Sequence, residues 1–127
     1  MTGRGLAMVA LVAAIGSASA QPAARHDFDP VGRWRFFHTD GKPFIARLAA
    51  DQTAATDFGG GDGERGIWRW EGQSVRVIYT DGWDDLLSRT ADGHFSKAGW
   101  SPEADRCGPP SNRAAAEQIS ADPGPPL

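Results

Sequence analysis

The feature that most constrains the fold is a set of turn signals that recurs through the middle of the chain at nearly even spacing. Successive signals are 11, 11, 9, 10 and 11 residues apart. Short strands separated by turns at such intervals are typical of all-β sandwiches and barrels. Most signals are Asp-Gly, which suits a hairpin because glycine tolerates the positive φ of a tight turn. They are Asp40-Gly41, Asp51-Gln52, Asp62-Gly63, Glu71-Gly72, Asp81-Gly82 and Asp92-Gly93.

Between these turns the sequence predicts an all-β domain, residues 31–100, with about seven strands in an antiparallel meander. We expect the meander to be closed as a small barrel or strongly curled. The predicted strands are 32–39, 44–49, 53–58, 66–70, 74–80, 83–90 and 95–100. A body this small buries only about 60% of the surface that its unfolded chain exposes, so its stability should be modest.

Two-residue turns assign the side chains to two faces of the sheet, because side chains alternate along a strand. A turn at Glu71-Gly72 places Trp68 opposite Val75, and one at Asp81-Gly82 places Tyr79 opposite Asp84. The face that collects apolar residues is the predicted core. Its members are Trp34, Phe36, Phe44, Ala46, Leu48, Trp68, Trp70, Val75, Val77, Tyr79, Leu86, Thr90 and Phe95.

The opposite face carries arginines on neighbouring strands, with apolar residues between them. It is either a solvated surface, whose arginines pair with acids such as Asp85, or a binding surface for an anionic partner. A third possibility is that the C-terminal tail covers its apolar residues. The arginines are Arg33, Arg35, Arg47, Arg69, Arg76 and Arg89, and the apolar residues are Ile67, Ile78, Leu87 and Trp100.

Five tryptophans are present, and tryptophan is favoured in sugar platforms and binding hot spots. Trp68 and Trp70 fall on the predicted core face, which leaves Trp83 and Trp100 for a binding surface. The candidate residues for binding a ligand or partner are therefore Arg33, Arg35, Arg69, Arg76, Arg89, Trp83 and Trp100.

The first twenty residues have the pattern of an export signal. Arg4 precedes the apolar run Leu6–Gly16, which is too short to span a bilayer, and Ala18 and Ala20 form a cleavage pattern. We expect cleavage after Ala20, a periplasmic or secreted product without a transmembrane segment, and a lead-in of residues 21–30. Cleavage changes the formal net charge from −3 to −4, because it removes one arginine and no acid. An acidic domain argues against nucleic acid as a partner.

Residues 101–127 are rich in proline and alanine, and we expect this tail to be mostly disordered. A short helix at residues 113–119 is the alternative, although it would be marginal unless docked. Cys107 is the only cysteine, so an intrachain disulfide and a metal site built on cysteine are both excluded.

Residue types that carry catalysis are sparse or poorly spaced. His26, His38 and His94 lack the spacing of metal ligands, and no serine lies in a nucleophile elbow. Most carboxylates lie at turns, where aspartate is favoured for backbone reasons. The acidic stretch 79–87 would need further oxygen ligands to hold calcium. We therefore expect no catalytic residues, no metal and no cofactor.

The segment Val31–Phe36, VGRWRF, carries a Gly-x-Trp at the start of the first strand. This resembles the entry signature of calycin-type barrels, including lipocalins and the small periplasmic inhibitors of secreted metalloproteases. The resemblance implies a β-barrel, and likeness to the inhibitors implies that residues 21–29 act in a protease cleft.

The sequence favours an exported, non-catalytic β-domain that binds a partner or ligand at the envelope or outside the cell. The partner could be a protein, a polysaccharide or a small ligand. The alternative is a periplasmic peptidase inhibitor of the small-barrel type, acting through its N-terminal segment.

Overall fold

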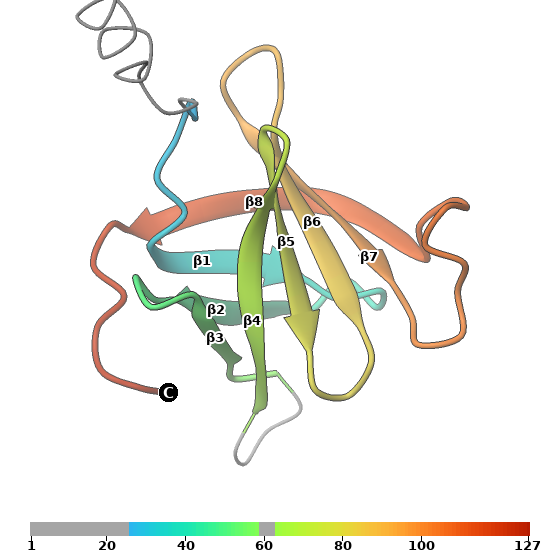
Figure 1. Cartoon of the computed structure of the whole chain (residues 1–127), viewed down its shortest axis with the longest axis horizontal. Coiled ribbons are helices and arrows are strands. Elements are labelled where there is room, and N and C mark those ends of the chain that lie inside the picture. The colour runs from blue at the N-terminus through green and yellow to red at the C-terminus, as the bar shows by residue number, and fades with distance from the viewer. Residues whose placement is uncertain (1–25, 59–62) are drawn as a thin grey trace, which may run out of the picture.

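The computed structural model describes residues 26–58 and 63–127, which form an eight-stranded antiparallel barrel (Figure 1). Each strand pairs with its neighbours in sequence, and β8 pairs with β1 to close the sheet. The all-β prediction is confirmed, whereas the predicted signal peptide lies outside the described residues. The strands are β1 Gly32–Phe37, β2 Pro43–Leu48, β3 Thr53–Thr56, β4 Glu64–Glu71, β5 Ser74–Tyr79, β6 Asp84–Arg89, β7 Phe95–Trp100 and β8 Asn112–Ser120.

Strand β8 corrects the prediction that residues 101–127 are mostly disordered. It pairs with β7 through Ala98 and Arg113, and with β1 through Trp34 and Gln118. Its more buried positions alternate and carry small or polar side chains, and of these only Ala116 is buried, while the others are half-buried. The prolines lie outside the strand, so they remove no amide from the ladder. Because its inner face has no large apolar residue, β8 lacks the pattern by which the other strands were predicted.

The joint between β1 and β8 depends on the glycine of Gly-x-Trp. Gly32 has a φ of 147°, and a Cβ there would lie 2.2 Å from the carbonyl oxygen of Ser120. Two residues later, Trp34 is fully buried and its Nε1 donates to the carbonyl of Pro30 at 2.9 Å. The segment therefore admits the closing strand and also anchors the chain where it enters the barrel.

The barrel interior is the core, and the predicted core face is largely confirmed. Leu86 and Thr90 are the exceptions: both are only half-buried and outside the buried cluster, whereas Leu87 is fully buried. The buried apolar cluster comprises Trp34, Phe36, Phe44, Ala46, Leu48, Ala54, Trp68, Val75, Val77, Tyr79, Leu87 and Ala116.

The exchange of Leu86 and Leu87 follows from the turn between β5 and β6. Tyr79 N–H donates to the carbonyl of Trp83 at 2.9 Å, so the loop has three residues rather than the two predicted. Gly82, the third of them, has a φ of 99°, which suits this longer turn. A shift of one residue in register exchanges the two faces of a strand. Leu87 therefore joins the core.

The turn between β6 and β7 is longer than predicted in the same way. Thr90 N–H donates to the carbonyl of His94 at 2.7 Å, and Arg89 rather than Thr90 pairs with Phe95. Arg89 therefore leaves the outer face to which the sequence prediction assigned it.

Candidate functional site

The register of β6 places a charged cluster inside one end of the barrel, where β5 turns into β6 (lower part of Figure 1). Lys97 Nζ lies 3.3 Å from Asp85 Oδ1, and the two side chains are only 2% and 4% exposed. Tyr79 donates its hydroxyl to Asp85 Oδ2 at 2.9 Å. The predicted position of Asp85, beside the outer arginines, is wrong because the strand is shifted by one residue.

Burial governs the protonation of this cluster. It raises the pKa of Asp85 above its ordinary 3.8, although the Lys97 ammonium and the Tyr79 hydroxyl partly oppose this effect. Burial, reinforced by the negative charge of Asp85, also raises the pKa of Tyr79 well above 10.0. Tyr79 therefore remains a hydrogen-bond donor at neutral pH, so Asp85 receives a fixed hydroxyl contact in addition to its ion pair.

Four aromatic rings enclose the approach to the ion pair. His38, which follows β1, stacks on Phe58 with centroids 4.3 Å apart and an interplanar angle of 24°. Trp83 lies 5.8 Å from the His38 ring, and Phe44 lies 5.3 Å from Phe58. The cavity between these rings and the ion pair has a volume of about 30 Å³. It could hold roughly two water-sized groups.

The polar groups of the lining are predominantly acidic. Glu64 and Asp81 line the cavity together with the ion pair, so three carboxylates accompany one ammonium. With His38 neutral, the formal charge of the lining is therefore −2. Glu64 is held in place by the Thr80 hydroxyl, which donates to its Oε1 at 2.6 Å.

Two buried polar atoms of the lining have no hydrogen-bond partner among the described residues: His38 Nδ1 and Asn112 Oδ1. The distance from His38 Nδ1 to Asp40 Oδ1 is 3.7 Å, which is too long for a hydrogen bond. Asn112 donates from Nδ2 to Thr39 Oγ1 at 3.0 Å, and this bond leaves its Oδ1 unused. A buried polar atom without a partner is uncommon and carries a desolvation cost.

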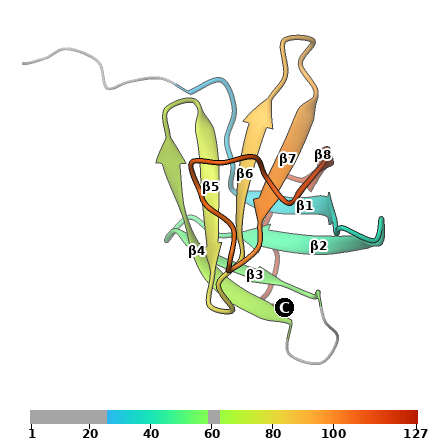
Figure 2. The ribbon, with the colours of Figure 1, turned by 90° about the vertical axis from the view of Figure 1, so that its right-hand side faces the viewer.

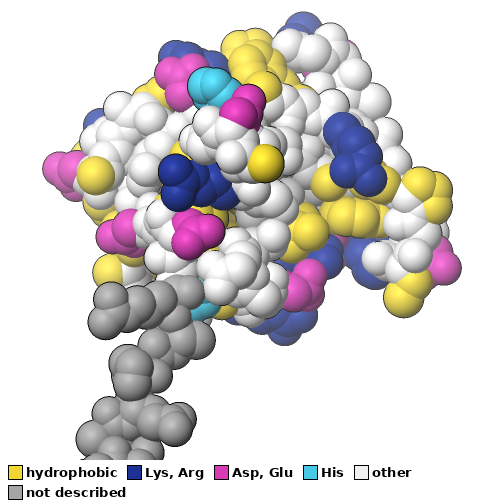
Figure 3. Space-filling model, turned by 90° about the horizontal axis from the view of Figure 1, so that it is seen from above, with side chains coloured by type: hydrophobic (Ala, Val, Ile, Leu, Met, Phe, Trp, Pro, Cys, Tyr) yellow, Lys and Arg dark blue, Asp and Glu magenta, His cyan; other side chains and the backbone are white. Residues whose placement is uncertain are grey.

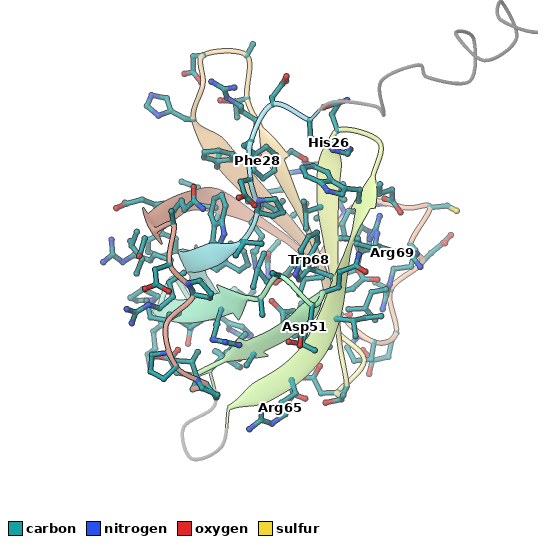
Figure 4. The ribbon with its side chains drawn as sticks, turned by 60° about the vertical axis from the view of Figure 1, so that its left-hand side comes forward. His26, Phe28, Asp51, Arg65, Trp68 and Arg69 are labelled. Atoms are coloured by element: carbon teal, nitrogen blue, oxygen red, sulfur yellow. The ribbon has the colours of Figure 1, made fainter. Side chains whose placement is uncertain are left out.

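The opposite end of the barrel is closed by the lead-in. His26 stacks on Trp70 with centroids 3.5 Å apart, and Phe28 meets the rings of Trp34, Trp70 and Phe95 at 5.0–6.1 Å. Figure 4 shows His26 and Phe28 at the end where β4 turns into β5, with Trp68 further into the barrel. The exterior seen from above carries mixed acidic and basic side chains (Figure 3). The lead-in thus contributes an aromatic plug.

The centre of the predicted arginine surface is occupied by contacts within the chain. Arg76 pairs with Glu71 at 2.6 Å and with Asp84 at 3.1 Å, and Arg106 pairs with Asp84 at 2.8 Å. Trp100 is only 7% exposed, and its ring lies 5.2 Å from the Arg76 guanidinium. Figure 2 shows the segment after β7 crossing the outside of the neighbouring strands. Trp100 is therefore not exposed: its Nε1 donates to the carbonyl of Gly108 at 3.1 Å, so the C-terminal tail covers this residue, which was the third possibility for the arginine face.

The other candidate arginines are distributed over different parts of the surface. Arg33 packs against Gly124, where a Cβ would lie 3.4 Å from the guanidinium carbon, and Arg35 pairs with Glu117 at 3.4 Å. Arg69 is exposed on β4, and Arg89 donates to the carbonyl of Asp27 at the closed end. Of the seven candidate residues, only Trp83 lines the cavity.

Sequence reasoning did not select Lys97, Asn112 or Phe58, because each lies alone in an unremarkable segment and the barrel brings them together. Within residues 26–58 and 63–127, no three histidine, cysteine, aspartate or glutamate side chains are grouped as metal ligands. Among the same described residues, no helix has the length and apolar character needed to cross a membrane.

Comparison with known protein families, with curated proteins and with solved structures finds no match to this chain. The resemblance to calycin barrels therefore stays a prediction.

Proposed function

We propose that this protein is a non-catalytic binding protein that takes the end group of a small ligand into the cavity beside Trp83. The observation that carries the proposal is the buried pair of Lys97 and Asp85 at the floor of an aromatic cavity. Replacing a buried ion pair by apolar residues is often neutral or stabilising, so such a pair is weak evidence for a role in stability. Its position at the floor of a cavity supports a role in recognition.

The size and walls of the cavity indicate how a ligand would lie. The volume of about 30 Å³ admits only a few atoms. The remainder of the ligand would lie against the half-buried rings of His38, Phe58 and Trp83 at the rim. Ligand sites commonly combine apolar and aromatic walls with a few placed polar groups.

The predicted export signal supports the further proposal that this binding takes place in the periplasm or outside the cell. The alternative function, inhibition of a peptidase by residues 21–29, has no supporting contact among the described residues. His26 and Phe28 pack onto the barrel, and residues 21–25 lie outside the described part of the chain. Unchanged inhibition of a secreted metalloprotease after deletion of residues 21–29 would exclude that mechanism.

The proposal is tested by nuclear magnetic resonance on ¹⁵N-labelled mature protein with a panel of small amines, alcohols, amides and carboxylic acids. We expect at least one compound to shift the indole signal of Trp83 in a saturable way, while the indole signal of Trp70 at the closed end stays fixed. Trp83→Ala lacks that indole, so its binding is followed by the backbone amide signals of the other cavity residues, and it should be about tenfold weaker, equivalent to about 1.4 kcal/mol.

Trp70→Ala is the matched control, because Trp70 is also half-buried but lies at the other end of the barrel. It should leave the affinity unchanged. If no compound of the panel shifts the Trp83 signal, or if both variants weaken binding equally, the proposal is wrong.

A further inference from the structure

We infer that the group taken into the cavity is the primary ammonium of a small amine. This inference rests on the proposed function and specifies the ligand class of the same cavity. It follows from the charge of the lining, from the hydrogen-bonding atoms left unused in it, and from its aromatic walls.

The charge of the lining favours a cation over an anion. Lys97 and Asp85 neutralise each other at 3.3 Å. The charges of Glu64 and Asp81 then remain, and no second cation from a lysine or arginine lines the cavity among the described residues. Low-dielectric walls strengthen the field of such unbalanced charges within a cleft. A carboxylate or phosphate entering here would be repelled.

The two atoms of the lining that lack a hydrogen-bond partner among the described residues can both accept a hydrogen bond, so they favour a ligand group that donates one. Asn112 Oδ1 can only accept a hydrogen bond, and neutral His38 accepts at Nδ1 when Nε2 carries its proton. The backbone of Gly99 packs closely beside the first of these atoms, so that only glycine fits there. A Cβ at Gly99 would lie 2.9 Å from Asn112 Oδ1 and 2.8 Å from Asp85 Oδ1. A primary ammonium offers three donors, whereas a quaternary ammonium offers none.

The aromatic walls suit the same group. An ammonium near the face of an aromatic ring is attracted by the ring quadrupole. The protein already holds one ammonium in this way, since Lys97 Nζ lies 5.6 Å from the centroid of Phe44. With about 30 Å³ available, the cavity has room for an ammonium and its first methylene. The carbon chain beyond them would lie against Trp83 and Phe58.

Three probes of equal chain length test the inference: butylammonium, 1-butanol and butyrate, titrated at pH 7 and constant ionic strength while the Trp83 indole signal is followed. We expect butylammonium to bind at least tenfold more tightly than 1-butanol, and butyrate to bind most weakly. Glu64→Gln should weaken butylammonium binding three- to tenfold and leave 1-butanol unaffected. Asn112→Asp should strengthen butylammonium binding, because it turns the amide that carries the unused oxygen into a negatively charged carboxylate.

Glu117→Gln is the matched control, because Glu117 is an acid on β8 with a side chain 63% exposed and outside the cavity. It should change none of the three affinities. If 1-butanol or butyrate binds as tightly as butylammonium, or if only non-amines from the wider panel shift Trp83, the ammonium inference is overturned and the binding function stands. If nothing shifts Trp83, both are overturned.

Discussion

The two ends of the barrel use aromatic rings in opposite ways. At the closed end, Phe28 meets Trp34, Trp70 and Phe95 edge to face, so the rings fill the space between one another. At the open end, the rings stand around a cavity, and a lysine and an aspartate form its floor. The rings of both ends contact one another, but those of the second end also border a cavity in which a ligand could pack.

The energetics of the two ends differ accordingly. Aromatic pairs packed edge to face contribute about 0.5–1.5 kcal/mol each beyond the burial of their area. The ion pair at the open end must instead offset the desolvation of two charges, and such pairs often contribute little net stability. If the proposed binding function is right, the closed end serves folding and the open end retains polar groups for recognition.

The largest expected effect comes from breaking the ion pair on one side only. Asp85→Ala leaves the buried ammonium of Lys97 without its partner and should lower the free energy of unfolding by about 3–5 kcal/mol. Removing the whole polar cluster with Asp85→Leu, Lys97→Met and Tyr79→Phe should restore most of that loss. Urea denaturation measures the free energy of unfolding of both variants.

The triple variant decides what the cluster is for. If it is as unstable as Asp85→Ala, the cluster is a source of stability and the contrast between the two ends fails. If it is stable but shifts no Trp83 signal with any ligand of the panel, the polar groups serve binding, as proposed.

A smaller effect is expected at the closed end. Phe28→Ala removes the aromatic plug from a half-buried position, so we expect a loss of about 2 kcal/mol, below the 3–5 kcal/mol typical of a fully buried phenylalanine. The affinity of the open end for its ligand should not change. His94→Ala is the control, because this histidine is exposed and should alter stability by less than about 0.5 kcal/mol. Lost ligand affinity in Phe28→Ala would show that the two ends are coupled.

Most of the barrel could be predicted from the sequence because it depends on local patterns. Alternating apolar residues between Asp-Gly turns located the first seven strands within a few residues of their observed bounds. The eighth could not be located this way, since its inward positions include Asn112, Ala114 and Gln118. It is a strand because β1 and β7 each offer it an open edge, which is a property of the closed sheet.

The candidate site was missed for a different physical reason. A two-residue and a three-residue loop both place glycine after aspartate, so Asp81-Gly82 does not fix the register of β6. Because the side-chain period is two, the error of one residue placed Asp85 outside and Leu86 inside. Trp83 was selected for another reason, as one of the two tryptophans left outside the predicted core once Trp68 and Trp70 were assigned to it. The pairing of Lys97 with Asp85 could not be predicted until both faces were correct.

The smallest expected effect is a difference in titration between an aspartate at each end. The pKa of Asp85 should exceed 3.8 because it is buried, whereas that of Asp92, in the turn between β6 and β7, should be lower because the Thr90 hydroxyl and the His94 N–H donate to it. Native Asp85 holds its proton more tightly than the unfolded chain does. Its contribution to stability therefore falls as pH rises from 3.8 through its raised pKa. Asp92 contributes stability above 3.8 that is lost as pH falls through its lowered pKa. The two pKa values are measured from the side-chain carboxyl ¹³C signals of the aspartates, followed from pH 2 to pH 7. If Asp85 titrates at or below 3.8, the attraction of Lys97 outweighs burial, and the ion pair stabilises the open end after all.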